Sequence, residues 1–230
     1  MKIYSHRGES KYAPENTLKA FYLADILKVD GIECDIRKTK DDVIVIIHDM
    51  TINRTSDGFG FIKDINYHDL LKYNFGRKND FEKIITLEEY LDYFSKKKMM
   101  LFIEIKEDGY EEDIINIIKR YKNDNITLIS FDYHALSNIR KITKNIKTGW
   151  IVFDYNKGIN SKAKEIAIDN IICPSIRLTK EKVDEMKKNN FIVTAWSLIN
   201  IKELDKLKSN GVDNVIYSSG YQAKKYLGDL

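Results

Sequence analysis

The chain alternates short apolar runs with helical patterns, and this alternation limits its fold more than any other feature. Nine runs have the length and the β-branched composition of strands. They span residues 2–5, 31–37, 43–48, 99–106, 126–131, 148–153, 170–173, 192–197 and 214–218. Amphipathic segments with a helical period separate most of them. Such an order is typical of α/β proteins that are built on a parallel sheet.

One of the nine runs cannot be a parallel strand. Only Lys40, Asp41 and Asp42 stand between Thr39 and Val43, whereas a parallel crossover needs about a dozen residues or more. The third run is therefore predicted to return antiparallel, as a hairpin arm on the second strand. The eight remaining strands alternate with helices, which predicts a (β/α)8 TIM barrel. A doubly wound open sheet is the alternative, but no Gly-x-Gly-x-x-Gly follows any strand.

The 230 residues contain no linker, internal repeat or low-complexity segment. We therefore expect residues 1–230 to form a single barrel domain, with a hairpin and a small insertion at about 40–85 after the second strand. An insertion of this length is more often a lid or a pocket wall than an idle loop. Its apolar side chains are candidates for a channel: Phe59, Phe61, Ile62 and Ile65.

Composition and charge exclude several classes of partner. The 38 basic and 35 acidic residues are interleaved and give a net charge of +3, which favours neither a nucleic acid nor an anionic membrane as partner. No apolar run approaches a membrane span, and the first strand leaves no room for a signal peptide, so a cytoplasmic protein without stable membrane insertion is predicted. Cys34 and Cys173 fit neither a disulfide framework nor a zinc site and are expected to be buried thiols. The oligomeric state stays open.

Two strands carry charged side chains at alternate positions. Glu33 and Asp35 are two residues apart and face one side of their strand, and Glu104 and Lys106 repeat the arrangement. A single Glu-x-Asp pair is more often on a solvated face. Its recurrence on two strands, each flanked by isoleucine, favours a shared interior at the carboxyl end of the barrel, where TIM-barrel active sites lie.

Three buried carboxylates in one place predict a cation. Like charges at close range and desolvation both disfavour their ionised forms, and a divalent ion resolves the conflict. Oxygen ligands favour Mg²⁺ or Ca²⁺ over zinc or copper. Arg7 and Lys106 would add positive charge to the same cavity. A metal, a guanidinium and an ammonium together indicate an anionic ligand and favour phosphate.

His6 and His48 end strands beside these charges. Two imidazoles can divide the roles of acid and base at neutral pH, as the hydrolysis of a phosphodiester requires. His68 and His134 are interpreted as structural residues, the latter in the first turn of a helix. Phe131 and Trp196 also end strands. They are candidates for a substrate pocket, although core packing explains them at least as well.

Together these motifs resemble the glycerophosphodiester phosphodiesterase family. Order and spacing agree over about the first half of the chain, and the second half agrees more weakly at Ser130-Phe131 and Thr194–Ser197. The C-terminal third departs from the family's pattern after Trp196 and at Tyr217–Gly220. The motifs of the first half are His6-Arg7-Gly8, Pro14-Glu15-Asn16-Thr17, Glu33-Cys34-Asp35, Thr39-Lys40-Asp41, His48-Asp49, Arg54-Thr55, Thr86-Leu87-Glu88-Glu89 and Glu104-Ile105-Lys106.

The resemblance implies a metal-dependent hydrolase that converts a small glycerophosphodiester to glycerol 3-phosphate and an alcohol. Attack by water and attack by the glycerol hydroxyl, through a cyclic phosphate, both stay open. So do two alternatives: a related enzyme that cleaves lysophospholipids, and a non-catalytic barrel that binds a phosphorylated ligand. By the matching positions, the resemblance implies that Glu33, Asp35 and Glu104 hold the metal. It implies that His6 and His48 are the acid–base pair, and that Arg7 and Lys106 bind the phosphate.

Overall fold

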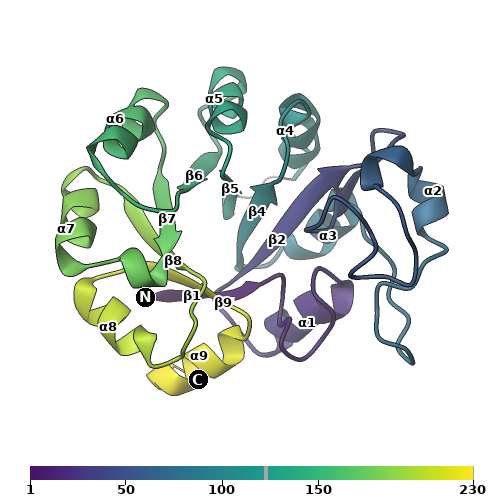
Figure 1. Ribbon diagram of the computed structural model, residues 1–230, viewed down its shortest axis with the longest axis horizontal. Helices are drawn as coiled ribbons and strands as arrows, with labels where there is room; N and C mark the ends of the chain where they lie inside the picture. Colours follow the sequence, from purple (N-terminus) through teal and green to yellow (C-terminus); the bar gives the residue numbers. More distant parts are fainter. Residues whose placement is uncertain (122–123, 230) are drawn as a thin grey trace.

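Eight parallel strands close into a barrel in the computed structural model of the protein, which describes residues 1–121 and 124–229 (Figure 1). Each strand pairs in parallel with the next around the barrel, and the last pairs with the first. The predicted TIM barrel is thus confirmed. Its strands are β1 (Lys2–His6), β2 (Gly31–Lys38), β4 (Met100–Ile105), β5 (Ile126–Ser130), β6 (Lys147–Ile151), β7 (Asn170–Pro174), β8 (Ile192–Trp196) and β9 (Asn214–Tyr217).

The third predicted strand is the hairpin arm. Strand β3 (Ile44–Ile46) pairs antiparallel with β2, with Ile36 opposite Ile46. The pairing continues one step further, because the backbone N–H of Ile47 donates to the carbonyl of Asp35 at 2.9 Å. All nine predicted strands are found, and their ends agree with the sequence-based ranges within two residues.

Helices surround the barrel, and the insertion lies outside this ring (Figure 1). Thr17, Asp132 and Thr179 cap helices with their side chains, and Thr86 forms a full capping box with Glu89. The surrounding helices are α1 (Leu18–Ile26), α3 (Leu87–Phe94), α4 (Glu111–Lys119), α5 (Tyr133–Ile142), α6 (Lys157–Glu165), α7 (Lys180–Lys188), α8 (Glu203–Asn210) and α9 (Gly220–Leu227).

The sequence Asn200-Ile201-Lys202-Glu203 has the spacing of a capping box and predicts Asn200 as an N-cap, but this prediction is wrong. Helix α8 begins only at Glu203, whose carboxylate accepts from the backbone N–H groups of Ile199 at 3.1 Å and Asn200 at 2.9 Å. The carboxylate therefore closes a turn that precedes the helix, and Asn200 is not its N-cap.

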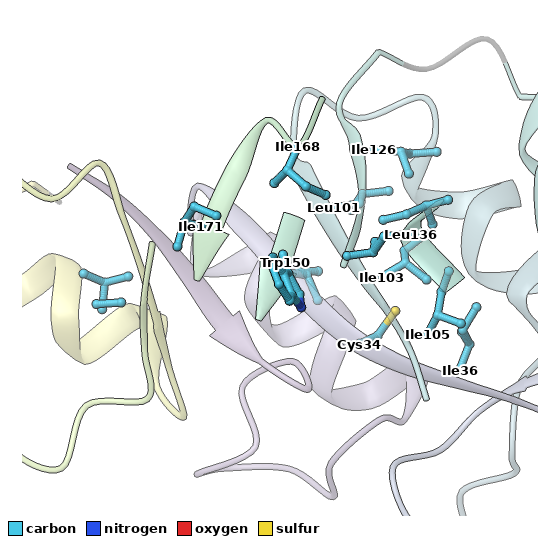
Figure 2. Close-up of a cluster of buried hydrophobic side chains, with 14 of the residues drawn as sticks. Cys34, Ile36, Leu101, Ile103, Ile105, Ile126, Leu136, Trp150, Ile168 and Ile171 are labelled. Carbon is cyan, nitrogen blue, oxygen red and sulfur yellow. The ribbon is translucent and has the colours of Figure 1, made fainter. Parts of the chain in front are cut away.

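Strand alternation separates two layers of side chains. Outward-facing residues of β2 and β4 pack against the helices, and Figure 2 shows part of this layer around Cys34, Ile36 and Ile103. Inward-facing residues form a second, smaller cluster inside the barrel, where the rings of Tyr4 and Phe102 stack 4.0 Å apart. Because Glu33, Asp35 and Glu104 occupy the inward-facing register, their carboxylates lie above this inner cluster. Both cysteines are free and buried, as predicted.

The insertion has a core of its own. It contains two short helices that the sequence did not reveal, η1 (Ile62–Asp64) and α2 (Tyr67–Leu70). Ile62 is buried in this core, so it cannot line the expected apolar channel, whereas Phe59 is 79% exposed. The core joins side chains of the hairpin arm to those of the insertion: Val45, Ile47, Ile52, Ile62, Leu70, Phe75 and Ile84.

No helix in the described part of the chain is long and apolar enough to cross a membrane. The cytoplasmic location stays a prediction.

Candidate active site

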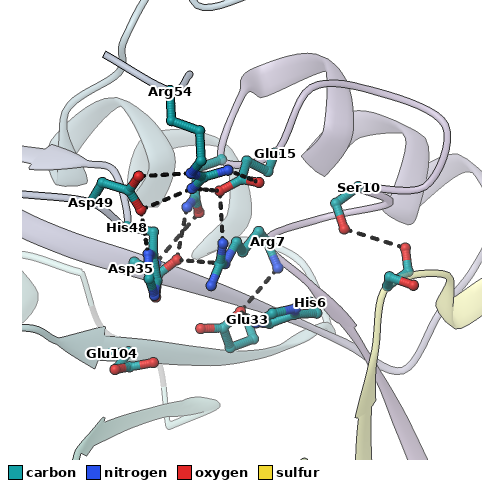
Figure 3. Close-up of polar contacts among 12 residues, drawn as sticks. His6, Arg7, Ser10, Glu15, Glu33, Asp35, His48, Asp49, Arg54 and Glu104 are labelled. Atoms are coloured by element: carbon teal, nitrogen blue, oxygen red, sulfur yellow. Dashed lines mark hydrogen bonds and ion pairs between the residues drawn. The ribbon is translucent and has the colours of Figure 1, made fainter. Parts of the chain in front are cut away.

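Strand register brings the three predicted carboxylates together at the carboxyl end of the barrel. Asp35 lies opposite Glu104 across the β2–β4 pair, and Glu33 lies opposite His6 across the β1–β2 pair. One oxygen atom from each of Glu33, Asp35 and Glu104 lies within 4.8 Å of the others, and all three side chains are buried. Figure 3 shows them converging on one space. This cluster could hold a metal ion.

The two predicted cations contact the same carboxylates. Lys106 Nζ lies 2.8 Å from an oxygen of Asp35 and 2.5 Å from an oxygen of Glu104. Arg7 Nε lies 3.2 Å from the other Asp35 oxygen, and the backbone N–H of Arg7 donates to Glu33 at 2.9 Å. The structure therefore brings Arg7 and Lys106 into the carboxylate cluster, each from the end of a barrel strand.

The turn after β1 aims Arg7 into the cluster. Its backbone is left-handed, with φ values of +56° at Arg7 and +77° at Gly8. A Cβ atom at Gly8 would lie only 2.7 Å from the carbonyl carbon of Ala20, so the turn packs directly against helix α1 and needs glycine there. A left-handed non-glycine residue such as Arg7 is strained, and such strain clusters at functional sites.

The three carboxylates are not fully compensated by the positive charges of Arg7 and Lys106. Burial, and then the neighbouring carboxylates, raise the pKa of Glu33 well above its usual range and that of Glu104 to about 7. For Asp35, Lys106 and Arg7 outweigh burial and hold the pKa below its usual range. Two cations thus satisfy one carboxylate and leave the other two short of compensation. A divalent cation would supply the missing charge, and the all-oxygen donor set suits Mg²⁺ or Ca²⁺.

His6 is held beside the cluster. Its Nε2 lies 3.8 Å from an oxygen of Glu33. Burial, and next the positive charge of Arg7, lower the pKa of His6 to about 4. The imidazole is therefore neutral at pH 7 and able to accept a proton.

His48 reaches the cluster on the hairpin arm. Its Nδ1 lies 2.6 Å from Asp49, and its carbonyl accepts from Arg37 Nε at 2.8 Å. Burial lowers the pKa of His48 against the opposing influence of Asp35 and Asp49. The contact at Nδ1 leaves Nε2 for proton transfer. In Figure 3 His6 lies beside Glu33, and His48 lies on the far side of the carboxylates beside Asp35.

The two candidate pocket residues belong to one aromatic cluster. The rings of Phe131 and Trp196 meet edge to face at 5.4 Å, and Phe153 lies 5.3 Å from Phe131. These residues lie at or just beyond the carboxyl ends of β8, β5 and β6, on the side of the barrel away from the insertion (Figure 1). Phe153 is 71% exposed and was not predicted. The exposed rings of Phe131 and Phe153 lie together and not singly, which is typical of a binding surface.

Comparison with known proteins decides the family. Residues 6–219 match the Glycerophosphoryl diester phosphodiesterase family. The chain belongs to this family. The predicted family and enzyme class are therefore confirmed.

Other members of the family are similar over nearly their whole length. A glycerophosphodiester phosphodiesterase of Caldanaerobacter subterraneus is 32% identical over 227 residues, which cover 93% of this chain and 92% of the relative. The putative glycerophosphodiester phosphodiesterase YhdW of Bacillus subtilis is 34% identical, with 94% and 93% covered.

Solved structures of the family share the fold. A phosphodiesterase of Oleispira antarctica, in complex with the product sn-glycerol-3-phosphate, superposes with a TM-score of 0.93 at 24% identity and covers 99% of this chain and 97% of its own. A glycerophosphodiester phosphodiesterase of Thermotoga maritima gives a TM-score of 0.83 at 24% identity, with 97% of each chain covered.

Three residues of the family's motifs form a network that sequence reasoning did not assign. Glu15, Asp49 and Arg54 are joined by hydrogen bonds above His48 and Arg7 (Figure 3). They were noted only as parts of the resemblance, because spacing along the chain does not show that the loop before α1 meets the insertion. The same holds for Asn16, which donates to Asp35 at 2.8 Å.

Proposed function

We propose that this chain hydrolyses small glycerophosphodiesters to glycerol 3-phosphate and an alcohol. One observation carries the proposal: a buried triad of carboxylates, short of positive charge, lies between two imidazoles and beside an arginine and a lysine. Relatives that carry the name glycerophosphodiester phosphodiesterase, one of them as putative, are 32% and 34% identical over more than nine-tenths of their length. A structural neighbour was solved with sn-glycerol-3-phosphate as its product.

We assign Glu33, Asp35 and Glu104 as ligands of one divalent cation, Mg²⁺ or Ca²⁺. Their oxygen atoms lie close enough to share one ion, and the raised pKa values of Glu33 and Glu104 are what a carboxylate pair without its cation would have. When bound, the cation supplies positive charge that neutralises the phosphate and stabilises the charge that builds up on it.

His6 and His48 share the proton transfers in this proposal. One imidazole takes the proton of the attacking hydroxyl, and the other gives a proton to the oxygen of the departing alcohol. The lowered pKa of His6 keeps its imidazole neutral at pH 7, which is the form that takes a proton. Giving a proton needs the charged form, which Asp35 and Asp49 favour at His48 against the effect of burial. The two histidines have the same acid and base roles whether water or the glycerol hydroxyl attacks the phosphate.

Arg7 and Lys106 bind the phosphate. The guanidinium offers a planar pair of donors and the ammonium offers a compact charge. Both already face the space between the carboxylates, from which their charge can reach a phosphate held there. Electrostatic stabilisation from groups fixed in advance is the largest contribution in many enzymes.

The aromatic cluster is assigned to the alcohol side of the substrate. Phe131 and Trp196 lie at the carboxyl ends of β5 and β8, and Phe131 is partly exposed. We further propose that residues 1–230 work as one barrel domain, in which the insertion at about 40–85 forms the opposite wall. The exposed rings of Phe59 and Phe61 on that insertion favour a second candidate substrate, a lysophospholipid, whose apolar chain is attached to its glycerol and would cover them.

A product assay tests the proposal. Purified protein is given glycerophosphocholine, glycerophosphoethanolamine or a long-chain lysophosphatidylcholine, with Mg²⁺, Ca²⁺ or EDTA. The phosphorylated product is measured, which is glycerol 3-phosphate from the first two and lysophosphatidic acid from the lysolipid. We expect release from the small diesters with one of the cations and none in EDTA. Faster cleavage of the lysolipid would show that lysophospholipids, and not small glycerophosphodiesters, are the preferred substrates. Binding without turnover of any diester would identify a non-catalytic barrel.

A further inference from the structure

Arg54 of the insertion contacts two carboxylates from separate segments. Its Nε and Nη2 lie 2.7 Å and 2.9 Å from the two oxygens of Asp49, which follows the hairpin arm. Its Nη1 and Nη2 lie 2.9 Å and 2.7 Å from the two oxygens of Glu15, in the loop between β1 and α1. The guanidinium thus makes a double contact with each carboxylate (Figure 3).

Each of these carboxylates has a second partner in the proposed catalytic set. Asp49 contacts His48 Nδ1 at 2.6 Å, and Glu15 accepts from Arg7 Nη1 at 2.8 Å. The path runs from the histidine through Asp49, Arg54 and Glu15 to the arginine without a gap. A displacement of Arg54 would therefore leave the partner of an acid–base group and the partner of a phosphate ligand without their shared support.

We infer that Arg54 is a positioning residue, which orients His48 through Asp49 and Arg7 through Glu15. The insertion thereby helps to hold the catalytic groups in place. This role rests on the proposed function of His48 and Arg7. Arg54 is the central member of the network because Glu15 and Asp49 would repel each other without a cation between them. Only a planar fork can make paired contacts with two carboxylates at once, so lysine is not an equivalent residue.

Two other roles would give different results. Arg54 is about half exposed and borders a polar cavity of about 530 Å³, which Thr55, Asn74 and Lys78 also line. A direct contact with substrate in that cavity would affect mainly KM. A purely structural role would change the stability of the insertion and leave His48 unaffected.

Kinetics of Arg54→Ala test the inference. We expect kcat to fall about 10- to 100-fold, the usual result of a small misplacement of catalytic groups, with KM changed less than about threefold. Arg54→Lys should recover part of the loss. The double variant Arg54→Ala/Asp49→Asn should lose less than the product of the two single losses, because both changes break the same branch to His48, whereas the branch through Glu15 to Arg7 is lost only with Arg54. Additive losses, or a raised KM at unchanged kcat, would overturn the positioning role.

A matched control and a second readout complete the test. Arg120 is a comparably exposed arginine that is ion-paired with Glu88 on the side of the barrel, and Arg120→Ala should leave kcat unchanged. The ¹⁵N resonances of His48 report its tautomer without any turnover, and Arg54→Ala should shift them while those of His134 stay in place. If wild-type protein released no glycerol 3-phosphate, the proposed function would fail, yet these spectra would still decide whether Arg54 orients His48. Unchanged His48 resonances would refute the inference.

Discussion

The two ends of the barrel use acidic residues in opposite ways. At the amino end, three aspartates each precede a strand, and each accepts a hydrogen bond from a backbone N–H of the adjacent strand, at 2.7 to 2.9 Å. Each also has a basic partner of its own. The pairs are Asp30 with Lys224, Asp169 with Arg140, and Asp213 with Lys187.

At the carboxyl end, three carboxylates share two cations. Glu33, Asp35 and Glu104 are all buried, whereas Asp169 and Asp213 are each more than one-third exposed. Burying a carboxylate without a matching positive charge destabilises the folded chain. The burial of these three therefore indicates that a ligand from outside the protein supplies the charge. The difference separates acids that hold the barrel together from acids that serve its chemistry, and the following experiments test that separation.

The largest effect is expected from removal of an imidazole at the carboxyl end. His6→Ala and His48→Ala should each lower kcat by about 10² to 10⁴, because each removes an acid or base from the reaction. Thermal unfolding should change little, since neither ring is part of the core. His134→Ala removes an exposed histidine from the first turn of α5 and should retain full activity. Wild-type rates in both site variants would refute the acid–base assignment.

A smaller effect, on the order of 3 kcal/mol, is expected for Glu104→Gln in metal-free buffer. The pKa of Glu104 is raised from 4.5 to about 7, so the folded chain retains a proton that the unfolded chain releases. Ionised Glu104 therefore lowers the free energy of unfolding as the pH rises from about 4.5 through 7. The variant, which cannot ionise, should match wild-type stability at pH 4.5 and exceed it at pH 7.

Urea unfolding in EDTA at the two pH values measures this difference. His6 has a lowered pKa and acts with the opposite sign over part of the same range, but it is present in both proteins and cancels in the comparison. Saturating Mg²⁺ or Ca²⁺ should reverse the order, because only the wild type keeps all three ligands. Equal stabilities at pH 4.5 and pH 7 would show that Glu104 is not short of compensating charge.

The barrel and the carboxylate cluster could be predicted because they depend on local pattern. Alternation along β2 and β4 fixes which side chains face inward, and the three-residue gap after Thr39 requires the hairpin. The contacts of Arg54 with Glu15 and Asp49 could not be predicted, since they join segments whose relative position depends on the packing of the insertion. Glu9 was missed for the same reason: it is buried and accepts from Ser5, Ser219 and the backbone of Tyr221, across the seam where the barrel closes.

At the amino end, Asp213→Ala should reduce the free energy of unfolding by about 1–3 kcal/mol, because the backbone N–H of Val193 loses a partner at 2.9 Å. Its activity should stay at the wild-type level, since the residue lies at the opposite mouth of the barrel. Asp184→Ala is the matched control: it breaks an exposed ion pair with Lys180 on α7 and should cost less than about 0.5 kcal/mol. A loss of turnover in a fully folded Asp213→Ala protein would refute the claim that acidic residues at the amino end serve stability alone.

The smallest effect is expected within the carboxyl end itself, where the charged cluster and the aromatic cluster face different parts of the substrate. Phe153→Ala removes an exposed ring, so stability should hold, and the ratio of kcat/KM values for two head groups should change about three- to tenfold. Phe59→Ala removes an equally exposed ring from the insertion and provides the comparison. A larger change in that ratio for Phe59→Ala would move the alcohol pocket from the aromatic cluster to the insertion, because only a side chain that contacts the leaving group can discriminate between head groups.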